Sequence, residues 1–322
     1  MNITFFSYVT TRREWFSHIP QLANHNCNFI KIDESERLTE DYPDTEILVI
    51  DAMGKADKAV IDSLPKLKLI QSEGVGYQGI DTEYAAEKGI AVCNNKGVND
   101  TAVAEDALLL MLACLKSLIT GHQSVYEGRQ IEVKQASFGV VRELSECTVG
   151  LIGFGDIARA TAKLCNALGA RVIYTNRTRY EDLEQGLGVT YMPLDELLAQ
   201  SDFVSLHLAV TKETKGIVND EFLIKMKSDA FLINTSRGDL VDNEALFNAL
   251  LNNRIAGAGL DVISPEPVLK DNILLDRRIA HKLILTPHIA GITRLTVNKI
   301  YMNIYENIER LSLGKELKNR IV

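Results

Sequence analysis

The amino-acid sequence predicts an α/β protein with two domains, each built on a parallel β-sheet. Three observations support this prediction. The chain has 322 residues, and a typical domain has about 150. Short apolar segments alternate with helix-like segments along most of the chain, as they do in parallel sheets. A glycine-rich turn at residues 153–158 opens a second series of this kind near the middle of the sequence.

Composition limits the classes of protein to which the chain can belong. The formal net charge is −8, which argues against a general nucleic-acid binder. The longest apolar run, residues 107–115, is far shorter than the ~20 residues of a membrane span. The N-terminal apolar run is too short for a signal peptide. Five scattered cysteines indicate reduced thiols rather than disulfides or a metal site. We therefore expect a cytoplasmic protein without a bound metal or a membrane partner.

The first series of elements occupies residues 1–100. Its strand candidates are short and apolar, and each is followed by turn or helix signals. They are residues 2–6, 47–51, 66–72 and 90–94. Residues 101–121 then predict one long helix, which Gly121 would end. Apolar residues cover most of its circumference, so we expect it to be buried on several sides.

The second series begins with the strand that precedes the glycine-rich turn, at residues 148–152. Further strands are predicted at residues 171–175, 202–208, 230–235, 256–262 and 283–288. Helices are predicted between them at residues 156–168, 194–200, 220–226 and 242–251. This alternation with short connections is typical of a doubly wound sheet. An amphipathic helix follows from residue 294 and ends at Gly314.

The glycine-rich turn has the pattern G-x-G-x-x-A, formed by Gly153, Gly155 and Ala158. Gly153 allows a tight turn, Gly155 allows the backbone to approach a pyrophosphate, and Ala158 allows close helix packing. The amides that open the helix, at Asp156 and Ile157, would face the phosphates. Because the motif follows a strand and opens a helix, it predicts dinucleotide binding.

The end of the next strand predicts which dinucleotide is bound. The position that usually holds an acidic residue for the adenosine ribose is Asn176, 21 residues after Gly155 (176 − 155). Asn removes the repulsion of a 2′-phosphate, and Arg177 and Thr178 can donate hydrogen bonds to it. Our hypothesis is that the arginines of this turn, Arg177 and Arg179, favour NADP(H) over NAD(H). The alternative is that they are solvated turn residues and that NAD(H) is used.

Three motifs downstream carry candidate catalytic side chains at or just beyond predicted strand ends, where open α/β sheets bind ligands. These are Arg237 in "INTSRGDLVD", Asp261 and Glu266 in "GLDVISPEP", and His288 in "LTPHIAG". Each has a structural alternative, as a turn residue, a loop residue or a buried histidine. We interpret the other five histidines as structural, with His207 the least certain; they are His18, His25, His122, His207 and His281.

As a set, these motifs resemble those of the D-isomer-specific 2-hydroxyacid dehydrogenases. The resemblance covers essentially the whole chain and includes "SEGVGYQGID", "NDTAVAEDALLLMLA", "LHLAVTKETKG" and "GKELKNRIV". Among the members of that family, "IYTNRTRY" looks most like the NADP-using glyoxylate and hydroxypyruvate reductases. The sequence has no tryptophan shortly before the glycine-rich strand, where many relatives have one.

The resemblance implies a role for each candidate residue. His288 would be the general acid, Glu266 would bond the other ring nitrogen, and Arg237 would bind the substrate carboxylate. The backbone amides of Val75 and Gly76 would hold the other side of that carboxylate. Asp261 would accept from the nicotinamide carboxamide. Five further residues would line the cofactor: Leu208, Ala209, Thr214, Thr235 and Ser236.

The resemblance also implies the domain organisation and the reaction. Residues 1–100 and 288–322 would form a substrate domain, and residues 101–287 would form an inserted Rossmann domain; both domains would be Rossmann-like or flavodoxin-like. The helix at 101–115 would help to form a homodimer. The reaction would be reduction of a small 2-keto acid such as glyoxylate or hydroxypyruvate.

Two alternatives to that reaction stay open. One is an NAD-dependent 3-phosphoglycerate or D-lactate-type dehydrogenase, for which Lys96 and Arg294 are candidate phosphate ligands. The other is a non-enzymatic, corepressor-like protein that senses dinucleotides.

Overall fold

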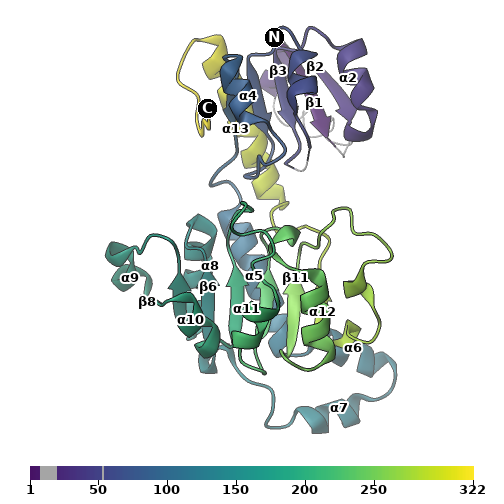
Figure 1. Ribbon diagram of the computed structural model, residues 1–322, viewed down its shortest axis with the longest axis vertical. Helices are drawn as coiled ribbons and strands as arrows, with labels where there is room; N and C mark the ends of the chain where they lie inside the picture. The colour runs from purple at the N-terminus through teal and green to yellow at the C-terminus, as the bar shows by residue number, and fades with distance from the viewer. Residues whose placement is uncertain (8–19, 53) are drawn as a thin grey trace. The chain divides into compact units, whose positions relative to one another are not determined.

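The computed structural model describes residues 1–7, 20–52 and 54–322, so His18 lies outside the described residues. The chain divides into two compact units (Figure 1). Unit 1 contains residues 1–98 and 294–322, and unit 2 contains residues 99–293. These bounds differ by only a few residues from those that the sequence predicts. The shift assigns His288 to unit 2.

Unit 1 contains a five-stranded parallel sheet with the order β2-β1-β3-β4-β5. The strands are β1 (Asn2–Ser7), β2 (Asn26–Lys31), β3 (Ile47–Ile50), β4 (Leu69–Ser72) and β5 (Ala91–Cys93). This order is that of a flavodoxin-like doubly wound sheet. The sequence prediction missed β2, which is an edge strand with only one buried residue, Ile30, and which includes polar residues.

Each face of this sheet is covered by helices. Alternate residues of a strand face opposite sides, so Phe5 belongs to one apolar cluster and Phe6 to the other. The long helix α13 (Arg294–Ser312) packs on the side of Phe5 through Tyr301, Ile304 and Ile308. The opposite cluster includes residues from α2 (Ser35–Asp41), α3 (Lys58–Asp62) and α4 (Thr82–Glu87).

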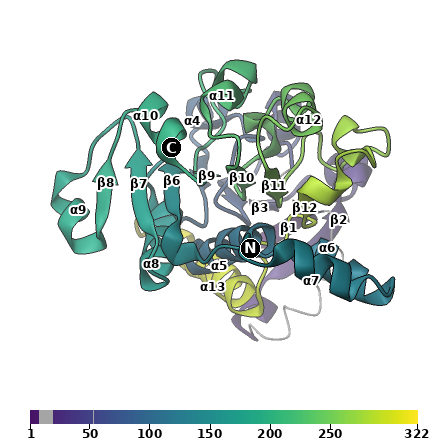
Figure 2. The same ribbon diagram turned by 90° about the horizontal axis from the view of Figure 1, so that it is seen from below.

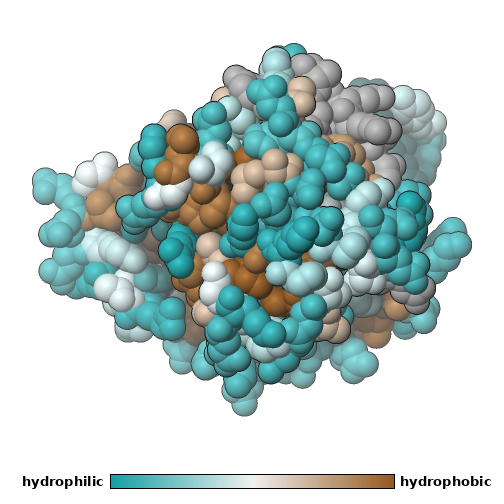
Figure 3. Space-filling view, turned by 90° about the horizontal axis from the view of Figure 1, so that it is seen from above, coloured by the Kyte–Doolittle hydropathy of each residue, from teal (hydrophilic) through white to brown (hydrophobic). Residues whose placement is uncertain are grey.

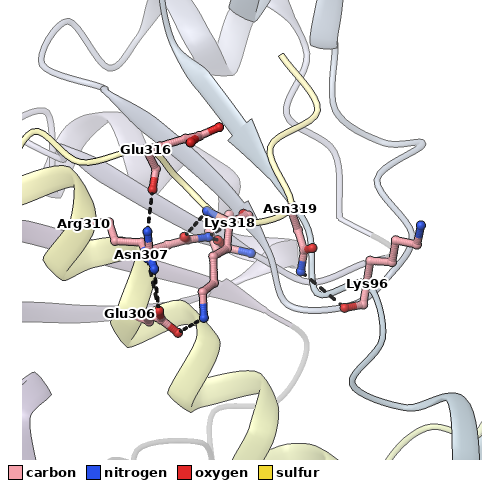
Figure 4. Close-up of polar contacts among 8 residues, drawn as sticks. Lys96, Glu306, Asn307, Arg310, Glu316, Lys318 and Asn319 are labelled. Atoms are coloured by element: carbon pink, nitrogen blue, oxygen red, sulfur yellow. Dashed lines mark hydrogen bonds and ion pairs between the residues drawn. The ribbon is translucent and has the colours of Figure 1, made fainter.

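The C-terminal segment joins unit 1 along β5. Ile321 N donates to Val92 O at 2.7 Å, and Arg320 forms an antiparallel bridge with Cys93. Figure 4 shows the polar contacts that hold this segment against α13. The buried Asn307 donates to Lys318 O at 3.1 Å and accepts from Lys318 N at 2.8 Å. These bonds hold the motif "GKELKNRIV" against β5 and α13, so the motif has a structural role in unit 1.

Unit 2 contains a seven-stranded parallel sheet with the order β12-β11-β10-β9-β6-β7-β8 (Figure 2). The strands are β6 (Thr148–Ile152), β7 (Arg171–Thr175), β8 (Val189–Tyr191), β9 (Phe203–Leu206), β10 (Phe231–Asn234), β11 (Gly257–Leu260) and β12 (Leu283–Leu285). Numbered within the unit, the order is 3-2-1-4-5-6-7, which contains the Rossmann order and its reversal beside β6. The predicted fold class is therefore confirmed in both units.

Helices cover both faces of the second sheet, as Figure 2 shows. On one face α5 (Asp100–Leu115) and α8 (Asp156–Ala167) pack together and against the strands. On the other face lie α10 (Leu194–Gln200), α11 (Asp220–Lys225) and α12 (Asn243–Leu251). The helix α9 (Glu181–Leu187) connects β7 and β8. Six 3-10 helices complete the described elements: Pro20–Asn24, Ile32–Glu34, Leu144–Glu146, Gly238–Leu240, Ile273–Leu275 and Ala280–Lys282.

The single helix predicted for residues 101–121 is wrong. It is interrupted at Ser117, which has a φ of +47°, a left-handed conformation that no α-helix continues through. A second helix, α6 (Leu118–Tyr126), follows and contains Gly121, which therefore does not end the helix. A third helix, α7 (Gln130–Ser137), was not predicted. Figures 1 and 2 show α6 and α7 extending beyond the sheet of unit 2.

The predicted dimer helix is mostly part of the core of its own unit. Ten of the 16 residues of α5 are buried, and the helix packs against α8, β10, β11 and β12. Exposed apolar side chains lie instead on α6, α7 and the segment that follows, which we call the arm (residues 118–141). They are Leu118, Ile119, Val125, Tyr126, Ile131, Phe138, Val140 and Val141.

Hydrophilic residues predominate on the face of the molecule drawn in Figure 3. Apolar residues occupy limited areas between them. Among the described residues, no helix combines the length and the apolar character that crossing a membrane requires.

Candidate active site

The glycine-rich turn has the geometry that its sequence predicts. Gly153 has a φ of +89°, and a Cβ atom there would lie 2.4 Å from the backbone oxygen of His207, so only glycine fits. Gly155 precedes the first turn of α8, and a Cβ atom there would meet nothing within 4 Å. Ala158 is fully buried. The open space beside Gly155 and the unpaired amides of a helix start are suited to bind an anion.

The turn after β7 presents its two arginines differently. Asn176 Nδ2 donates to Thr178 O at 3.0 Å, which closes the turn and leaves the amide oxygen of Asn176 available. Arg179 binds both carboxylate oxygens of Glu184, at 2.7 and 2.9 Å. Arg177 forms no hydrogen bond or ion pair with any residue that the structure describes. The pKa of Glu213 is lowered mainly by its bond from Thr211 and partly by the charge of Arg177.

The ends of β9 and β10 bring more predicted cofactor residues to the same edge of the sheet. Thr214 Oγ1 donates to Ala209 O at 2.7 Å and so fixes the loop that follows Leu208. Ser236 Oγ donates to Leu206 O at 2.7 Å. Thr235 is buried, and its Oγ1 has no hydrogen-bond partner among the described residues. Because a buried polar atom usually has a partner, this hydroxyl is a candidate ligand contact.

The backbone around Arg237 is fixed by Asn234, which sequence reasoning missed. The fully buried Asn234 donates to Arg237 O at 2.8 Å and accepts from Ser236 N at 3.0 Å. Gly238 is required because a Cβ atom there would lie 2.3 Å from Ser264 N. Burial lowers the pKa of Arg237, and the charge of Glu266 opposes that shift. The guanidinium stays charged because its ordinary pKa is far above neutral pH.

Asp261 holds the loop that carries His288. Its Oδ1 accepts from Thr286 Oγ1 at 2.7 Å and from Ile289 N at 2.8 Å, and its Oδ2 accepts from Ala290 N at 3.0 Å. Its backbone oxygen accepts from His288 N at 2.9 Å. These bonds support His288 at a φ of +55°, a conformation that costs a non-glycine residue about 1–2 kcal/mol. A carboxylate offers about four acceptor positions, so Oδ2 has room for one more donor.

His288 and Glu266 form a close pair. His288 Nδ1 lies 2.7 Å from Glu266 Oε1, which leaves Nε2 as the ring nitrogen without a bond to this carboxylate. The bond to Glu266 raises the pKa of His288, although burial and the charge of Arg237 act in the opposite direction. The pair therefore favours a protonated imidazole with Nε2–H available as an acid.

Val75 and Gly76 lie after β4 in unit 1. Their carbonyl oxygens are held by side chains: Asn94 Nδ2 donates to Val75 O at 2.8 Å, and Ser72 Oγ donates to Gly76 O at 2.6 Å. Neither backbone amide has a hydrogen bond within the described residues. The sequence prediction named these amides. It did not name Asn94, which holds the carbonyl group in the peptide plane of the Gly76 amide, or Asn95, whose N donates at 2.9 Å to Gly74 O in the plane of the Val75 amide.

His207 is partly buried, and only one of its ring nitrogens has a partner among the described residues. Its Nε2 lies 3.0 Å from Ser205 Oγ, and its Nδ1 has no partner among the described residues. Burial lowers the pKa of His207 to about 4, so the ring is neutral at pH 7. Residues 1–7, 20–52 and 54–322 contain no cluster of three or more His, Cys, Asp or Glu side chains suited to a metal ion.

The predicted residues of unit 2 meet at the carboxyl edge of one sheet, after β6, β7, β9, β10, β11 and β12. Residues 108–290 match the family described as D-isomer specific 2-hydroxyacid dehydrogenase, NAD binding domain. The chain belongs to that family. As a 2-hydroxyacid dehydrogenase it is an NAD(P)-dependent oxidoreductase. The dinucleotide fits the residues present, because the space at Gly155 and the unpaired hydroxyl of Thr235 are suited to it.

Relatives and solved structures agree with this family. The chain is 35% identical to a glyoxylate reductase of Korarchaeum cryptofilum over 278 residues, which cover 86% of this chain and 83% of the relative. It is 35% identical to a hydroxypyruvate reductase of Thermotoga maritima over 275 residues, with 85% and 87% covered.

Two solved dehydrogenase-like structures superpose on nearly the whole chain. The D-lactate dehydrogenase of Aquifex aeolicus, complexed with NAD and lactic acid, has a TM-score of 0.87 and 29% identity and covers 97% of this chain and 96% of its own. An acyclic imino acid reductase in complex with NADPH and D-Arg has a TM-score of 0.86 and 28% identity, with all of both chains covered.

Proposed function

We propose that this 2-hydroxyacid dehydrogenase reduces a small 2-keto acid, glyoxylate or hydroxypyruvate, with NADPH as the favoured cofactor and NADH possible. The observation that carries the proposal is the bonded pair of His288 and Glu266 within electrostatic reach of Arg237. A proton donor and a cation that can bind a carboxylate are the two groups that the protein itself must supply for reduction of a keto acid.

His288 is the general acid in this proposal. The nicotinamide, when bound, supplies the hydride. Nε2–H of His288 gives a proton to the keto oxygen, since Nδ1 is bonded to Glu266. Glu266 stabilises the protonated ring before the transfer and keeps the tautomer fixed after it. In the opposite direction the neutral ring takes the proton from the hydroxyl group.

Arg237 binds the substrate carboxylate and polarises its carbonyl group. A planar guanidinium can bond two oxygens at once, which a lysine cannot do with fixed geometry. The amides of Val75 and Gly76 in unit 1 stay predicted substrate contacts. The carbonyl groups in the same peptide planes as these amides are already held, Gly74 O by Asn95 N and Val75 O by Asn94 Nδ2, so the orientation of the amides is set before substrate binds.

The dinucleotide would be held along the carboxyl edge of unit 2. The amides at Gly155, Asp156 and Ile157 face the pyrophosphate, and Thr235 and Asp261 receive the nicotinamide end. The support is the unpaired Thr235 hydroxyl and the remaining acceptor position on Asp261. Leu208, Ala209, Thr214 and Ser236 line the same edge.

Arg177 reads the 2′-phosphate of NADPH in this proposal, together with Thr178. A charge-assisted hydrogen bond contributes about 1.5–3 kcal/mol, or one to two decades of preference. Arg177→Asp should then reverse or abolish the preference for NADPH. The support is that Arg177 has no partner among the described residues and that Asn176 brings no negative charge.

Assembly and location complete the proposal. A homodimer is expected from the family resemblance, and the exposed apolar residues of the arm are the surface best suited to a second copy. A cytoplasmic location is in keeping with the five free cysteines.

The test of the proposed reaction is the oxidation of NADPH and of NADH in parallel, with glyoxylate, hydroxypyruvate, pyruvate and phosphohydroxypyruvate. We expect the highest kcat/KM with NADPH and one of the first two acids. Preference for pyruvate or the phosphorylated acid with NADH would instead support the D-lactate or 3-phosphoglycerate alternative. Cofactor binding without turnover on any acid would support the sensing alternative.

A further inference from the structure

We propose that Tyr174, Arg179 and Glu184 form a clasp that positions the turn at residues 176–179, and that Arg177 is the only arginine of this turn that contacts the 2′-phosphate. This inference rests on the proposed use of NADP(H). It assigns the two arginines different tasks, although the sequence presents them as a similar pair.

The clasp is a closed chain of hydrogen bonds around the turn. Tyr174 Oη donates to Glu184 Oε1 at 3.0 Å and accepts from Tyr180 N at 2.9 Å. Arg179 binds the same carboxylate through Nε and Nη2. The last residue of the turn and the end of β7 are therefore tied to one point on α9, so the loop between them has few conformations available.

The Arg179 guanidinium has other neighbours besides Glu184. Its Nη1 lies 3.3 Å from Glu181 Oε1, and its guanidinium lies 5.6 Å from the centre of the Tyr191 ring. The Arg179 side chain is 49% exposed and that of Glu184 is 16% exposed, so solvent screens the charge attraction in part, but the two-point bonding holds the guanidinium in place. A phosphate would have to displace Glu184 to bind Arg179. Arg177 has no bonded carboxylate among the described residues, and Glu213 interacts with it only through charge.

A second set of contacts links the clasp to the glycine-rich turn. The ring of Phe154, which lies between Gly153 and Gly155, stacks on Tyr174 with centroids 3.9 Å apart. The Arg159 guanidinium of α8 lies 4.6 Å from the centre of the Tyr180 ring. The pyrophosphate turn and the ribose turn are thus packed on one aromatic core, and the distance between the two cofactor contacts is fixed.

The direction in which one substitution changes the cofactor preference distinguishes the clasp from a direct contact between Arg179 and the 2′-phosphate. Removing the Glu184 charge in Glu184→Ala should raise the preference for NADPH if Arg179 reads the phosphate, because it frees a cation. The clasp predicts the opposite: the ratio of kcat/KM for NADPH to that for NADH falls about 3- to 10-fold, as expected for the loss of one or two hydrogen bonds. Arg179→Met should lower the ratio by a similar factor. The double variant Glu184→Ala/Arg179→Met should lower the ratio by no more than either single substitution does.

Tyr174→Phe is the matched conservative variant, because it keeps the buried ring and removes only the hydroxyl. It changes no charge, so it should lower the ratio only if the clasp positions the turn. Turnover with NADH reports in each variant whether the active site is intact. A rise of the ratio in Glu184→Ala, or equal increases of KM for both cofactors, would overturn the proposal.

Arg177→Ala distinguishes failure of the clasp from failure of its premise. We expect this variant to lower the ratio by about tenfold or more. If Arg177→Ala lowers the ratio and both Glu184→Ala and Tyr174→Phe leave it unchanged, the clasp alone is wrong. If Arg177→Ala leaves the ratio unchanged, the proposed contact between Arg177 and the 2′-phosphate is wrong. The clasp proposal depends on that contact, so it is then wrong as well.

Discussion

His288 Nδ1 lies 2.7 Å from Glu266 Oε1, and the backbone of the same histidine is held by Asp261. Two acidic residues therefore act on one histidine in different ways. Glu266 sets the charge and tautomer of the ring, while Asp261 bonds the amides of Ile289 and Ala290 and sets its position. The bonds of Asp261 give it a structural task beside the cofactor contact expected from the sequence.

The Glu266 bond should set the pH range of keto-acid reduction. The pKa of His288 is raised above its ordinary value of 6.5, and reduction needs the protonated ring. The rate should therefore be full at low pH and be lost as pH rises through the raised pKa. In Glu266→Gln this loss should occur at lower pH, and kcat at pH 7.5 should fall about 10- to 100-fold.

Oxidation of the hydroxy acid should show the opposite dependence, because it needs the neutral ring. Its rate should rise with pH, and Glu266→Gln should shift that rise to lower pH. Profiles of kcat/KM against pH in both directions check this. A profile that Glu266→Gln does not move would assign the titrating group elsewhere.

Arg237→Ala should raise KM for the keto acid and lower kcat together, because the guanidinium acts on the substrate before and during the reaction. Arg237→Lys keeps the charge but loses the planar fork, so it should restore only part of the activity. Cofactor affinity, measured by fluorescence titration, should change little in both variants. A change confined to cofactor affinity would refute the proposed carboxylate contact.

The buried carboxylate of Asp106 should lower the free energy of unfolding at neutral pH. It is 9% exposed, and its Oδ2 has no hydrogen-bond partner among the described residues. Burial, with a smaller contribution from the charge of Asp261, raises the pKa of Asp106 from 3.8 to about 6. The folded state therefore holds its proton more tightly than the unfolded state, and stability falls as pH rises from about 4 to 6.

The substitution Asp106→Asn should remove this penalty. Above pH 6 it should raise the free energy of unfolding by an amount on the order of 1–3 kcal/mol, and near pH 4 it should have little effect. Urea unfolding of both proteins at pH 4.5 and pH 8 measures the difference. Equal effects at both pH values would show that the carboxylate charge is not the cause.

The arm should mediate self-association. Phe138 is 90% exposed and Tyr126 is 82% exposed, which is unusual for large apolar side chains unless a partner covers them. Phe138→Asp and Tyr126→Asp should weaken the homodimer, as measured by sedimentation velocity across a range of concentrations. Ile224→Asp is the control, since Ile224 is 65% exposed but lies on α11, outside the arm. Dissociation by the control as well, or by none of the three, would count against the arm.

Much of the fold follows from patterns that short segments carry by themselves. The helix α10 and the strand β7 have the predicted bounds because an apolar repeat and turn residues mark both ends. The strand β2 was missed because it is an edge strand with polar residues. The break at Ser117 could not be predicted, since a serine and not a glycine adopts the left-handed backbone there.

The candidate site shows the same division. The residues that would touch ligands, such as Arg237 and His288, belong to motifs that the sequence displays. The residues that orient the ligand-binding groups do not: Asn234 and Asn94 act through bonds to backbone atoms. The tasks of Arg177 and Arg179 also differ only because Glu184, five residues beyond Arg179, lies within bonding distance of it. Such contacts depend on the folded chain.

The most direct test of the proposed mechanism is a single-turnover measurement with His288→Gln. NADPH is bound first at saturating concentration, and its oxidation is followed after mixing with glyoxylate or hydroxypyruvate. If His288 is the acid, the variant should bind NADPH as tightly as the native enzyme, while hydride transfer slows by about 10²- to 10⁴-fold. Hydride transfer at the native rate, with NADPH bound, would show that another group supplies the proton.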